Sequence, residues 1–143
     1  MRKKKSALQK KKDNPKSGYW KNKADRLWGI VIHAASDRCA VDNGECSGNL
    51  EAHHLISRAN VTLRHKRING ILLCSLHHKY SKHISPHGAP LAFSEWMMTE
   101  RPDQWQWASE NKYKTDAKPD YQQAYNDLLA WCECEGVDPS GKG

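Results

Sequence analysis

The spacing of cysteine and histidine residues limits what this chain can fold into more than any other feature. Cys74-x-x-His77 has the spacing of a zinc knuckle, and Cys39 and Cys46 lie at the two ends of a loop whose Asn-Gly dipeptide favours a tight turn. Structural zinc takes four nitrogen or sulfur ligands. We therefore predict a structural zinc held by Cys39, Cys46, Cys74 and His77. The alternative is that Cys39 and Cys46 are ordinary small hydrophobic residues, because the gap between them is wider than usual.

A structural metal would compensate for a small hydrophobic core. Only 38% of the 143 residues are hydrophobic and only one is Phe, so a chain about one domain long has little apolar material to bury. The odd number of cysteines, five, argues against a disulfide framework. Cys132 and Cys134 are isolated from other ligands and are interpreted as spare thiols.

Hydrophobic periodicity predicts a mixed fold of class α+β. Strands are expected over 50–56 and 71–74, helices over 75–83, 91–98 and 121–134, and either a helix or a strand over 25–35. Pro102, with Trp105 and Trp107, indicates an aromatic-rich turn. The expected organisation is a flexible basic arm at 1–23, one domain at 24–107, a helical extension at 108–136 and a disordered tail at 137–143.

Positive charge is concentrated in two regions of the chain. Residues 1–23 carry a net charge of +9, and residues 52–94 carry +6 with no acidic side chain, whereas the whole chain carries +7. Seven of the eight histidines also lie in 52–94. This clustering is expected of a protein that binds a polyanion such as nucleic acid. For the N-terminal tail alone, a solvated segment is the alternative.

A second group of candidate residues begins at Glu51-Ala52-His53-His54. Asn69 follows fifteen residues after His54, and His78 follows nine residues after Asn69. Together with the knuckle residues, the stretches EAHHLISR, NGILLC and SLHHKYSKH resemble the HNH (ββα-metal) endonuclease family. The resemblance covers about 60 residues, within 38–107.

This resemblance implies a role for each of these residues. By position, His53 and His78 bind a catalytic metal, His54 is the general base, and Asn69 braces the loop that orients the base. A neutral imidazole near pH 7 suits such a base. The resemblance also implies a small ββα-metal core with a zinc knuckle, flanked by helices, and products with a 5′-phosphate and a 3′-hydroxyl. The catalytic ion is left open among Mg, Mn, Ni and Zn.

The third ligand of the catalytic metal is where the sequence departs from the family. The usual position, one helical turn after His78, holds Lys82. His83 follows one residue later, and His87 lies in the next loop, Ser-Pro-His. A phage-type subgroup of the family resembles the whole stretch from HHLISR to SPHGAPLAFSEWM, including the histidine of that loop, which favours His87 over His83. Either residue could instead contact a phosphate.

Basic residues that could contact DNA fall into two groups. The loop between the two halves of the HNH-like stretch carries Arg58, Arg64, Lys66 and Arg67, and the arm carries Lys3, Lys4, Lys5, Lys10, Lys11 and Lys12. Phosphate contacts from the loop would position DNA without reading its sequence, and the arm would add salt-dependent affinity. The alternative for the loop is solvated surface charge.

These observations predict a metal-dependent DNA endonuclease that nicks or cuts both strands by hydrolysing phosphodiester bonds. The alternative is a non-catalytic, zinc-stapled nucleic-acid-binding module, which the departure at Lys82 keeps open. No signal peptide and no apolar run of about 18 residues occurs, so the expected location is the cytoplasm, of the host if the chain is phage-encoded. A monomer and a homodimer are both left open.

Overall fold

The chain folds into helices around a small sheet, in a computed structural model that describes residues 1–115 and 118–142. The elements in order are α1 (Ala7–Asp13), α2 (Gly18–Ala34), β1 (Leu50–His54), η1 (Arg67–Asn69), β2 (Gly70–Cys74), η2 (Leu76–Tyr80), α3 (Pro90–Glu100), α4 (Pro102–Asn111) and α5 (Tyr121–Glu135). β1 and β2 form a two-stranded antiparallel sheet. The predicted α+β class is therefore confirmed.

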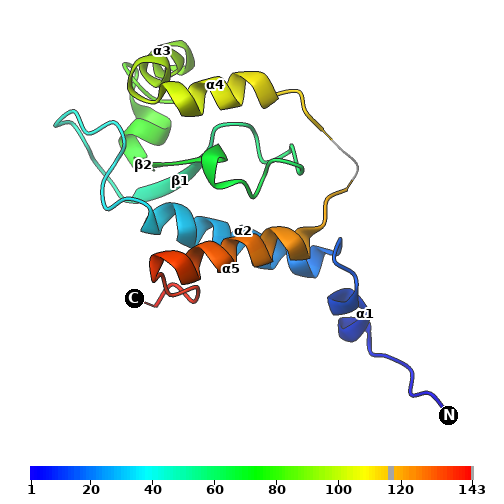
Figure 1. Ribbon diagram of the computed structural model, residues 1–143. Coiled ribbons are helices and arrows are strands. Elements are labelled where there is room, and N and C mark those ends of the chain that lie inside the picture. Colours follow the sequence, from blue (N-terminus) through cyan, green and yellow to red (C-terminus); the bar gives the residue numbers. More distant parts are fainter. Residues whose placement is uncertain (116–117, 143) are drawn as a thin grey trace.

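The sheet lies between two pairs of helices. Figure 1 shows α2 and α5 side by side below the strands and α3 and α4 above them. Alternate residues of a strand face opposite sides, so Leu72 packs with α2 and α5, whereas Ile71 and Leu73 pack with Phe93 and Met97 of α3. Two small cores result, one on each face of the sheet.

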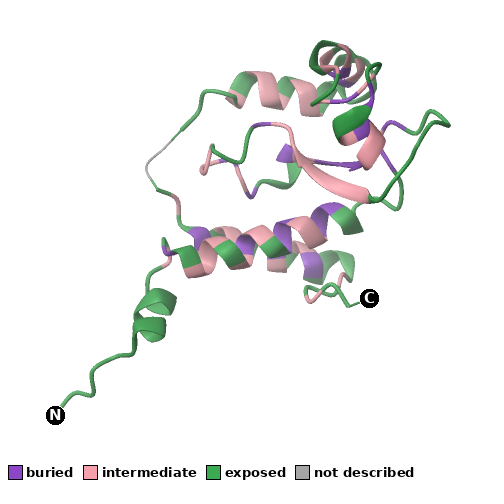
Figure 2. Cartoon of the chain, turned by 180° about the vertical axis from the view of Figure 1, so that it is seen from behind, coloured by how far each residue is buried: buried purple, intermediate pink, exposed green. Residues whose placement is uncertain are grey.

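Helix α2 is the longest helix of the described chain. It packs with Leu72 of β2 and Leu128 and Cys132 of α5 in the core on one face of the sheet, which we call the lower core. Its buried residues, Ala24, Leu27, Trp28, Val31 and Ile32, recur at helical spacing and make one apolar face. This buried face is visible along α2 in Figure 2. The segment 25–35, which fitted a helix or a strand from sequence alone, is therefore part of a helix that packs against the sheet and α5.

The strand register places Gly70 opposite His54. A Cβ atom on Gly70 would lie 2.3 Å from Cδ1 of Ile32 and 2.7 Å from Cζ2 of Trp28. Glycine at this position thus lets α2 approach the sheet closely, beside His54. The Asn-Gly dipeptide at 69–70 is not a hairpin turn, because Asn69 ends η1 and Gly70 begins β2.

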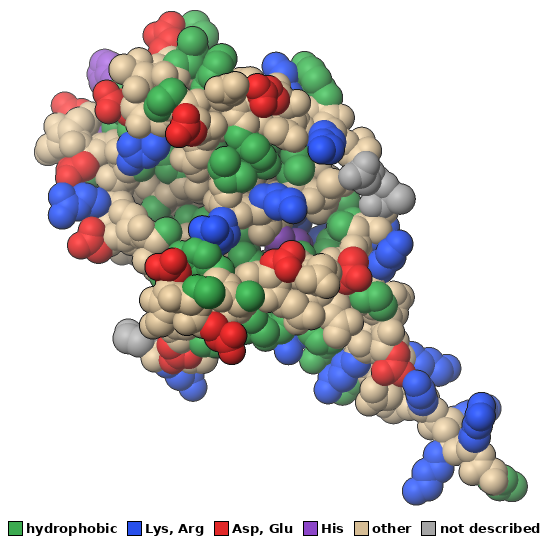
Figure 3. All heavy atoms as spheres, viewed as in Figure 1, with side chains coloured by type: hydrophobic (Ala, Val, Ile, Leu, Met, Phe, Trp, Pro, Cys, Tyr) green, Lys and Arg blue, Asp and Glu red, His purple; other side chains and the backbone are tan. Residues whose placement is uncertain are grey.

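The N-terminal region differs from the flexible arm predicted over 1–23. Residues 18–23 belong to α2, and Ser6 caps α1 by accepting a hydrogen bond from the backbone N–H of Gln9. Trp20 Nε1 donates to the carbonyl of Lys12, which ties α1 to α2. No residue of α1 is buried, and Figure 3 shows Lys and Arg side chains along the N-terminal projection from the body of the protein.

Three further expectations differ from the structure. The aromatic-rich turn expected near Pro102 is wrong, because these residues form α4; proline suits the first turn of a helix, where its missing N–H is not needed. The helix expected over 75–83 is a π-helical segment of five residues, η2. The tail expected to be disordered contacts the fold, since Val137 packs on the lower core and Ser140 accepts a hydrogen bond from Arg26.

The contrast between two glycines gives a test of this packing. We expect Gly70→Ala to lower the free energy of unfolding by about 1–3 kcal/mol, because the added methyl group overfills the contact with α2. Gly29→Ala, within α2, places its methyl group more than 4 Å from every atom outside its neighbours and the backbone of the same helix, and it should raise the free energy of unfolding by about 0.5–1 kcal/mol. Urea unfolding of the two variants measures both values. Equal effects would contradict the close approach of α2 to the sheet.

Candidate metal centres

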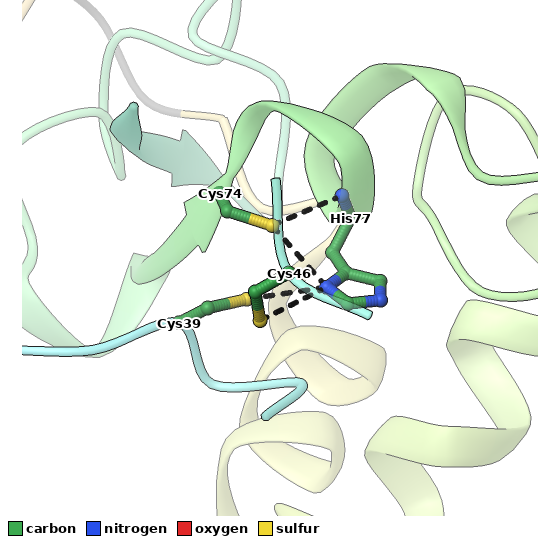
Figure 4. A group of neighbouring side chains, drawn as sticks. All are labelled: Cys39, Cys46, Cys74 and His77. Atoms are coloured by element: carbon green, nitrogen blue, oxygen red, sulfur yellow. Dashed lines mark hydrogen bonds between the residues drawn. The ribbon is translucent and has the colours of Figure 1, made fainter. Parts of the chain in front are cut away.

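Three thiols surround one imidazole nitrogen at the end of β2. The Sγ atoms of Cys39, Cys46 and Cys74 lie 3.5, 3.6 and 3.3 Å from Nδ1 of His77. Figure 4 shows all four side chains pointing toward one another. Tetrahedral zinc with ordinary bond lengths separates sulfur and nitrogen ligands by about 3.5 Å. The group predicted from sequence is therefore assembled, and it could hold a structural zinc.

Backbone pairing positions the four ligands. The N–H of Ala40 donates to the carbonyl of Leu72, which sets Cys39 beside β2. The N–H groups of Ser75 and Leu76 donate to the carbonyls of Asn49 and Ser47, so the loop that carries Cys46 closes over the end of the strand. Gly48 allows this close approach: its φ is +84°, and a Cβ atom there would lie 2.7 Å from Cβ of Ser75.

Cys39 and Cys46 keep their protons as long as no cation lies among the thiols. Burial, followed by the neighbouring Cys39 thiol, raises the pKa of Cys46 to about 12, and burial also raises the pKa of Cys39. Three thiolates packed around one nitrogen would repel one another without a positive charge among them. A bound zinc ion supplies that charge, and its binding must release protons from the thiols.

Three further imidazoles converge on one another in a second group. His53 of β1, His78 of η2 and His87 of the loop before α3 have possible ligand atoms that all lie within 4.8 Å of one another. His53 Nδ1 and His78 Nε2 are 3.1 Å apart, a separation expected for two ligands of one metal ion. Of the two sequence candidates for a third ligand, the structure brings His87 into this group; His83 is exposed and lies outside it.

Serine side chains shape the loop that carries His87. Ser85 Oγ donates to the carbonyl of Ser81 and accepts from the N–H of Gly88, at 2.7 and 2.8 Å. Ser85 is fully buried, and the N–H of Ala89 donates to its carbonyl. The chain therefore turns back on itself at 85–89, which aims His87 at the strand.

Glu51 orients His78, a role that the sequence reasoning did not identify. Its Oε2 accepts hydrogen bonds of 2.9 Å from His78 Nδ1 and from Lys79 Nζ, and its Oε1 accepts one of 2.7 Å from Ser75 Oγ. Hydrogen bonds from Lys79, Ser75 and His78 lower the pKa of the Glu51 carboxyl to about 2. The bond to Nδ1 leaves Nε2 of His78 for a metal. The sequence feature that could have identified this role is the two-residue period of a strand, which places Glu51 on the same face as His53.

The His53 imidazole of this group is held neutral. Burial, and then the charges that His78 and His87 would carry, lower the pKa of His53 to about 3. Neutral imidazoles present nitrogen lone pairs, which is the state required of metal ligands. The arrangement could hold a divalent cation.

His54 lies on the other face of β1, and Asn69 braces the loop beside it. Fully buried Asn69 accepts a hydrogen bond of 2.7 Å from the N–H of Ile56 and donates to the carbonyls of Ile56 and Leu63. Nε2 of His54 lies 3.0 Å from the carbonyl oxygen of Arg64 and, as the protonated nitrogen, donates to it. Nδ1 of His54 then keeps its lone pair. Burial lowers the pKa of His54, which keeps the ring neutral.

His54 and the three converging imidazoles line the same cleft, whose volume is about 650 Å³. Its lining includes His53, His54, His78, His87, Arg58 and Lys79. The cleft therefore combines a possible metal group, a neutral imidazole and two cationic side chains.

The basic residues predicted to contact DNA have different surroundings. Arg58 is exposed and lines the cleft, and Lys66 and Arg67 are exposed outside it, with Arg67 over the ring of Trp131. Arg64 does not fit the prediction, because its guanidinium forms a bidentate ion pair with Asp25 and its side chain is only 14% exposed. The lysines of the arm lie before and within α1, where Lys5 pairs with Asp13.

Comparisons with protein-family models, with curated proteins and with solved structures give no match to this chain. No helix of the described residues is long and apolar enough to cross a membrane.

The thiol-rich group gives a prediction about zinc. We expect the wild-type protein to retain one zinc ion per chain after dialysis, and Cys74→Ser to lose it with a fall in Tm of roughly 10 °C or more, because the metal joins the loop to the sheet. Cys134→Ser is the control, since Cys134 is exposed and outside the group. Elemental analysis and thermal unfolding measure both effects. Full zinc content in Cys74→Ser would contradict the ligand assignment.

Proposed function

We propose that this protein is a metal-dependent DNA endonuclease of the HNH type, built on a ββα-metal core, that hydrolyses phosphodiester bonds. The observation that carries the proposal is the presence of His54, a neutral imidazole with a free lone pair, in the same cleft as the converging group of His53, His78 and His87. The proposal also draws on the sequence resemblance, whose ligand and base positions fall on these residues.

In this proposal His54 is the general base. Its Nδ1 takes a proton from the attacking water. The hydrogen bond from its Nε2–H to the carbonyl of Arg64 stabilises the imidazolium that forms. A divalent cation bound by His53, His78 and His87 would stabilise the charge on the phosphate and on the departing oxygen. Imidazole ligands favour Mn, Ni or Zn over Mg, which prefers oxygen.

The remaining side chains of the cleft suit a phosphate-containing substrate. Arg58 is exposed and can pair with a phosphate next to the bond that is cut. Lys79 is held by Glu51, so its charge is partly neutralised within the protein. Lys66, Arg67 and the lysines of α1 would add affinity that does not depend on DNA sequence and that falls with salt.

The first test of this function is plasmid nicking. Zinc-loaded wild-type protein is expected to convert supercoiled plasmid to nicked or linear forms with Mn²⁺ or Ni²⁺, and His54→Ala is expected to lower the rate by about 100- to 10,000-fold, the usual contribution of a general base. DNA binding should be little affected, because His54 carries no charge.

Two outcomes of the nicking assay count against the proposal. If wild type and His54→Ala are equally active, His54 is not the base. If neither cuts with Mg²⁺, Mn²⁺, Ni²⁺ or Zn²⁺ while both bind DNA, the protein is the zinc-stapled binding module instead. His33→Ala is a matched control, since His33 is exposed on α2 and does not line the cleft.

The second test separates the two candidates for the third metal ligand. We expect His87→Ala to weaken binding of Mn²⁺ by more than about tenfold, since even partners of the ligands contribute 10- to 100-fold. His83→Ala, four residues earlier and outside the group, should leave Mn²⁺ affinity unchanged. Electron paramagnetic resonance of free Mn²⁺, with zinc already bound, measures both affinities. The reverse order of the two variants would show that His83 is the ligand.

A further inference from the structure

Helix α2 lies outside the HNH-like stretch 51–87, yet it contacts His54 directly. The indole of Trp28 stacks on the His54 imidazole, with ring centroids 3.8 Å apart and planes 8° apart. Trp28 is only 4% exposed and belongs to the lower core with α5. Because the indole is itself held by this core, the stack fixes the plane of the His54 ring.

Helix α2 also holds the loop whose carbonyl accepts the hydrogen bond from His54. The carbonyl of Arg64 accepts the hydrogen bond from His54 Nε2, and two residues later the carbonyl of Lys66 accepts one of 3.0 Å from Trp28 Nε1. Trp28 therefore acts on His54 twice, through the stack and through the loop.

Asp25, one turn before Trp28 on α2, holds the other side of this loop. Its carboxylate accepts hydrogen bonds from Arg64 Nε and Nη2 at 2.7 and 2.8 Å, and from His65 Nε2 at 2.6 Å. Burial alone would raise the pKa of Asp25, but the bonds from Arg64 and His65 lower it below its usual value. The carboxylate is therefore ionised, and it joins two consecutive side chains to the helix.

We propose that Trp28 and Asp25 are positioning residues that set, from helix α2, the ring plane and the proton-bearing nitrogen of His54. The catalytic meaning of this inference rests on the proposed function, whereas the state of the His54 ring can be measured without it. Neither Trp28 nor Asp25 is among the described residues that line the cleft, so both act through His54 and its loop.

The consequence for catalysis follows from geometry. Without the stack, the imidazole can rotate about its Cβ–Cγ bond, and a half-turn exchanges the places of Nδ1 and Cδ2 and of Nε2 and Cε1. Without Asp25, the carbonyl of Arg64 is free to move from Nε2. In either case the lone pair of Nδ1 no longer faces one direction, and misplacement of a reacting group by about 1 Å can lower a rate about 100-fold. DNA binding should not change, because neither residue lies in the cleft.

The kinetic test uses the full chain, loaded with zinc and assayed on supercoiled plasmid with Mn²⁺. We expect Trp28→Leu and Asp25→Ala to lower kcat by about 10- to 100-fold with KM unchanged. Trp28→Phe, which keeps an aromatic face, should recover most of the loss. Leu128→Ala is the matched control, because Leu128 is 2% exposed in the same core; it should lower Tm but leave kcat within about twofold at a temperature where every variant is folded.

A structural test does not require activity. With ¹⁵N-labelled histidine, the wild-type protein and Leu128→Ala should show His54 with its proton on Nε2 and with ring protons shifted upfield by the indole. Trp28→Leu should lose the upfield shift, and Asp25→Ala should show a mixture of the two neutral tautomers. If Trp28→Leu does not fold, Asp25→Ala decides the matter.

The two tests distinguish the failure of the inference from that of the function. Unchanged His54 signals in Asp25→Ala, and in Trp28→Leu where it folds, or losses of kcat no larger than in Leu128→Ala, would overturn the positioning role. If the wild-type protein shows the expected His54 signals but cuts no plasmid, the endonuclease proposal is overturned. The conclusion that α2 positions the His54 ring would then remain valid.

Discussion

The convergence of three thiols on Nδ1 of His77 is the contact on which the rest of the site depends. It joins the loop of Cys39 and Cys46 to the end of β2, and so fixes the short helix η2. The next residue, His78, belongs to the second group, with His53 and His87, and Glu51 holds its Nδ1. One histidine pair thus serves two different groups, and the position of His78 follows from the anchoring of His77.

Strand β1 divides its two histidines in the same way. His53 faces His78, His87 and Phe93, whereas His54 faces helix α2 and stacks on Trp28. Glycine opposite His54 removes the side chain that would keep α2 away from the sheet. Because side chains alternate between the two faces of a strand, each histidine packs against different neighbours. Both residues nevertheless line one cleft.

The parts of the site that could be predicted from sequence depend on short spacings. The knuckle ligands, the histidine pairs and the bracing role of Asn69 all fall within such patterns, and the loop of His87 was favoured on the same basis. The contacts of Asp25 and Trp28 with the site could not be predicted, because their partners lie 26 to 40 positions further along the chain and the pattern of α2 indicates only burial. The ion pair of Arg64 with Asp25 could not be predicted for the same reason, since the two residues are distant in sequence. Helix α4 was missed because proline suits both a turn and the first turn of a helix.

We propose that this small fold can hold two separate metal ions, with the consecutive residues His77 and His78 each binding one of them. Anomalous X-ray diffraction from crystals of the zinc-loaded protein soaked in Mn²⁺ tests it most directly. We expect a zinc peak among Cys39, Cys46, Cys74 and His77, and a separate manganese peak bounded by His53, His78 and His87. A zinc peak alone, with no manganese at the three imidazoles at saturating Mn²⁺, would contradict the second centre, and zinc bound elsewhere would contradict the first.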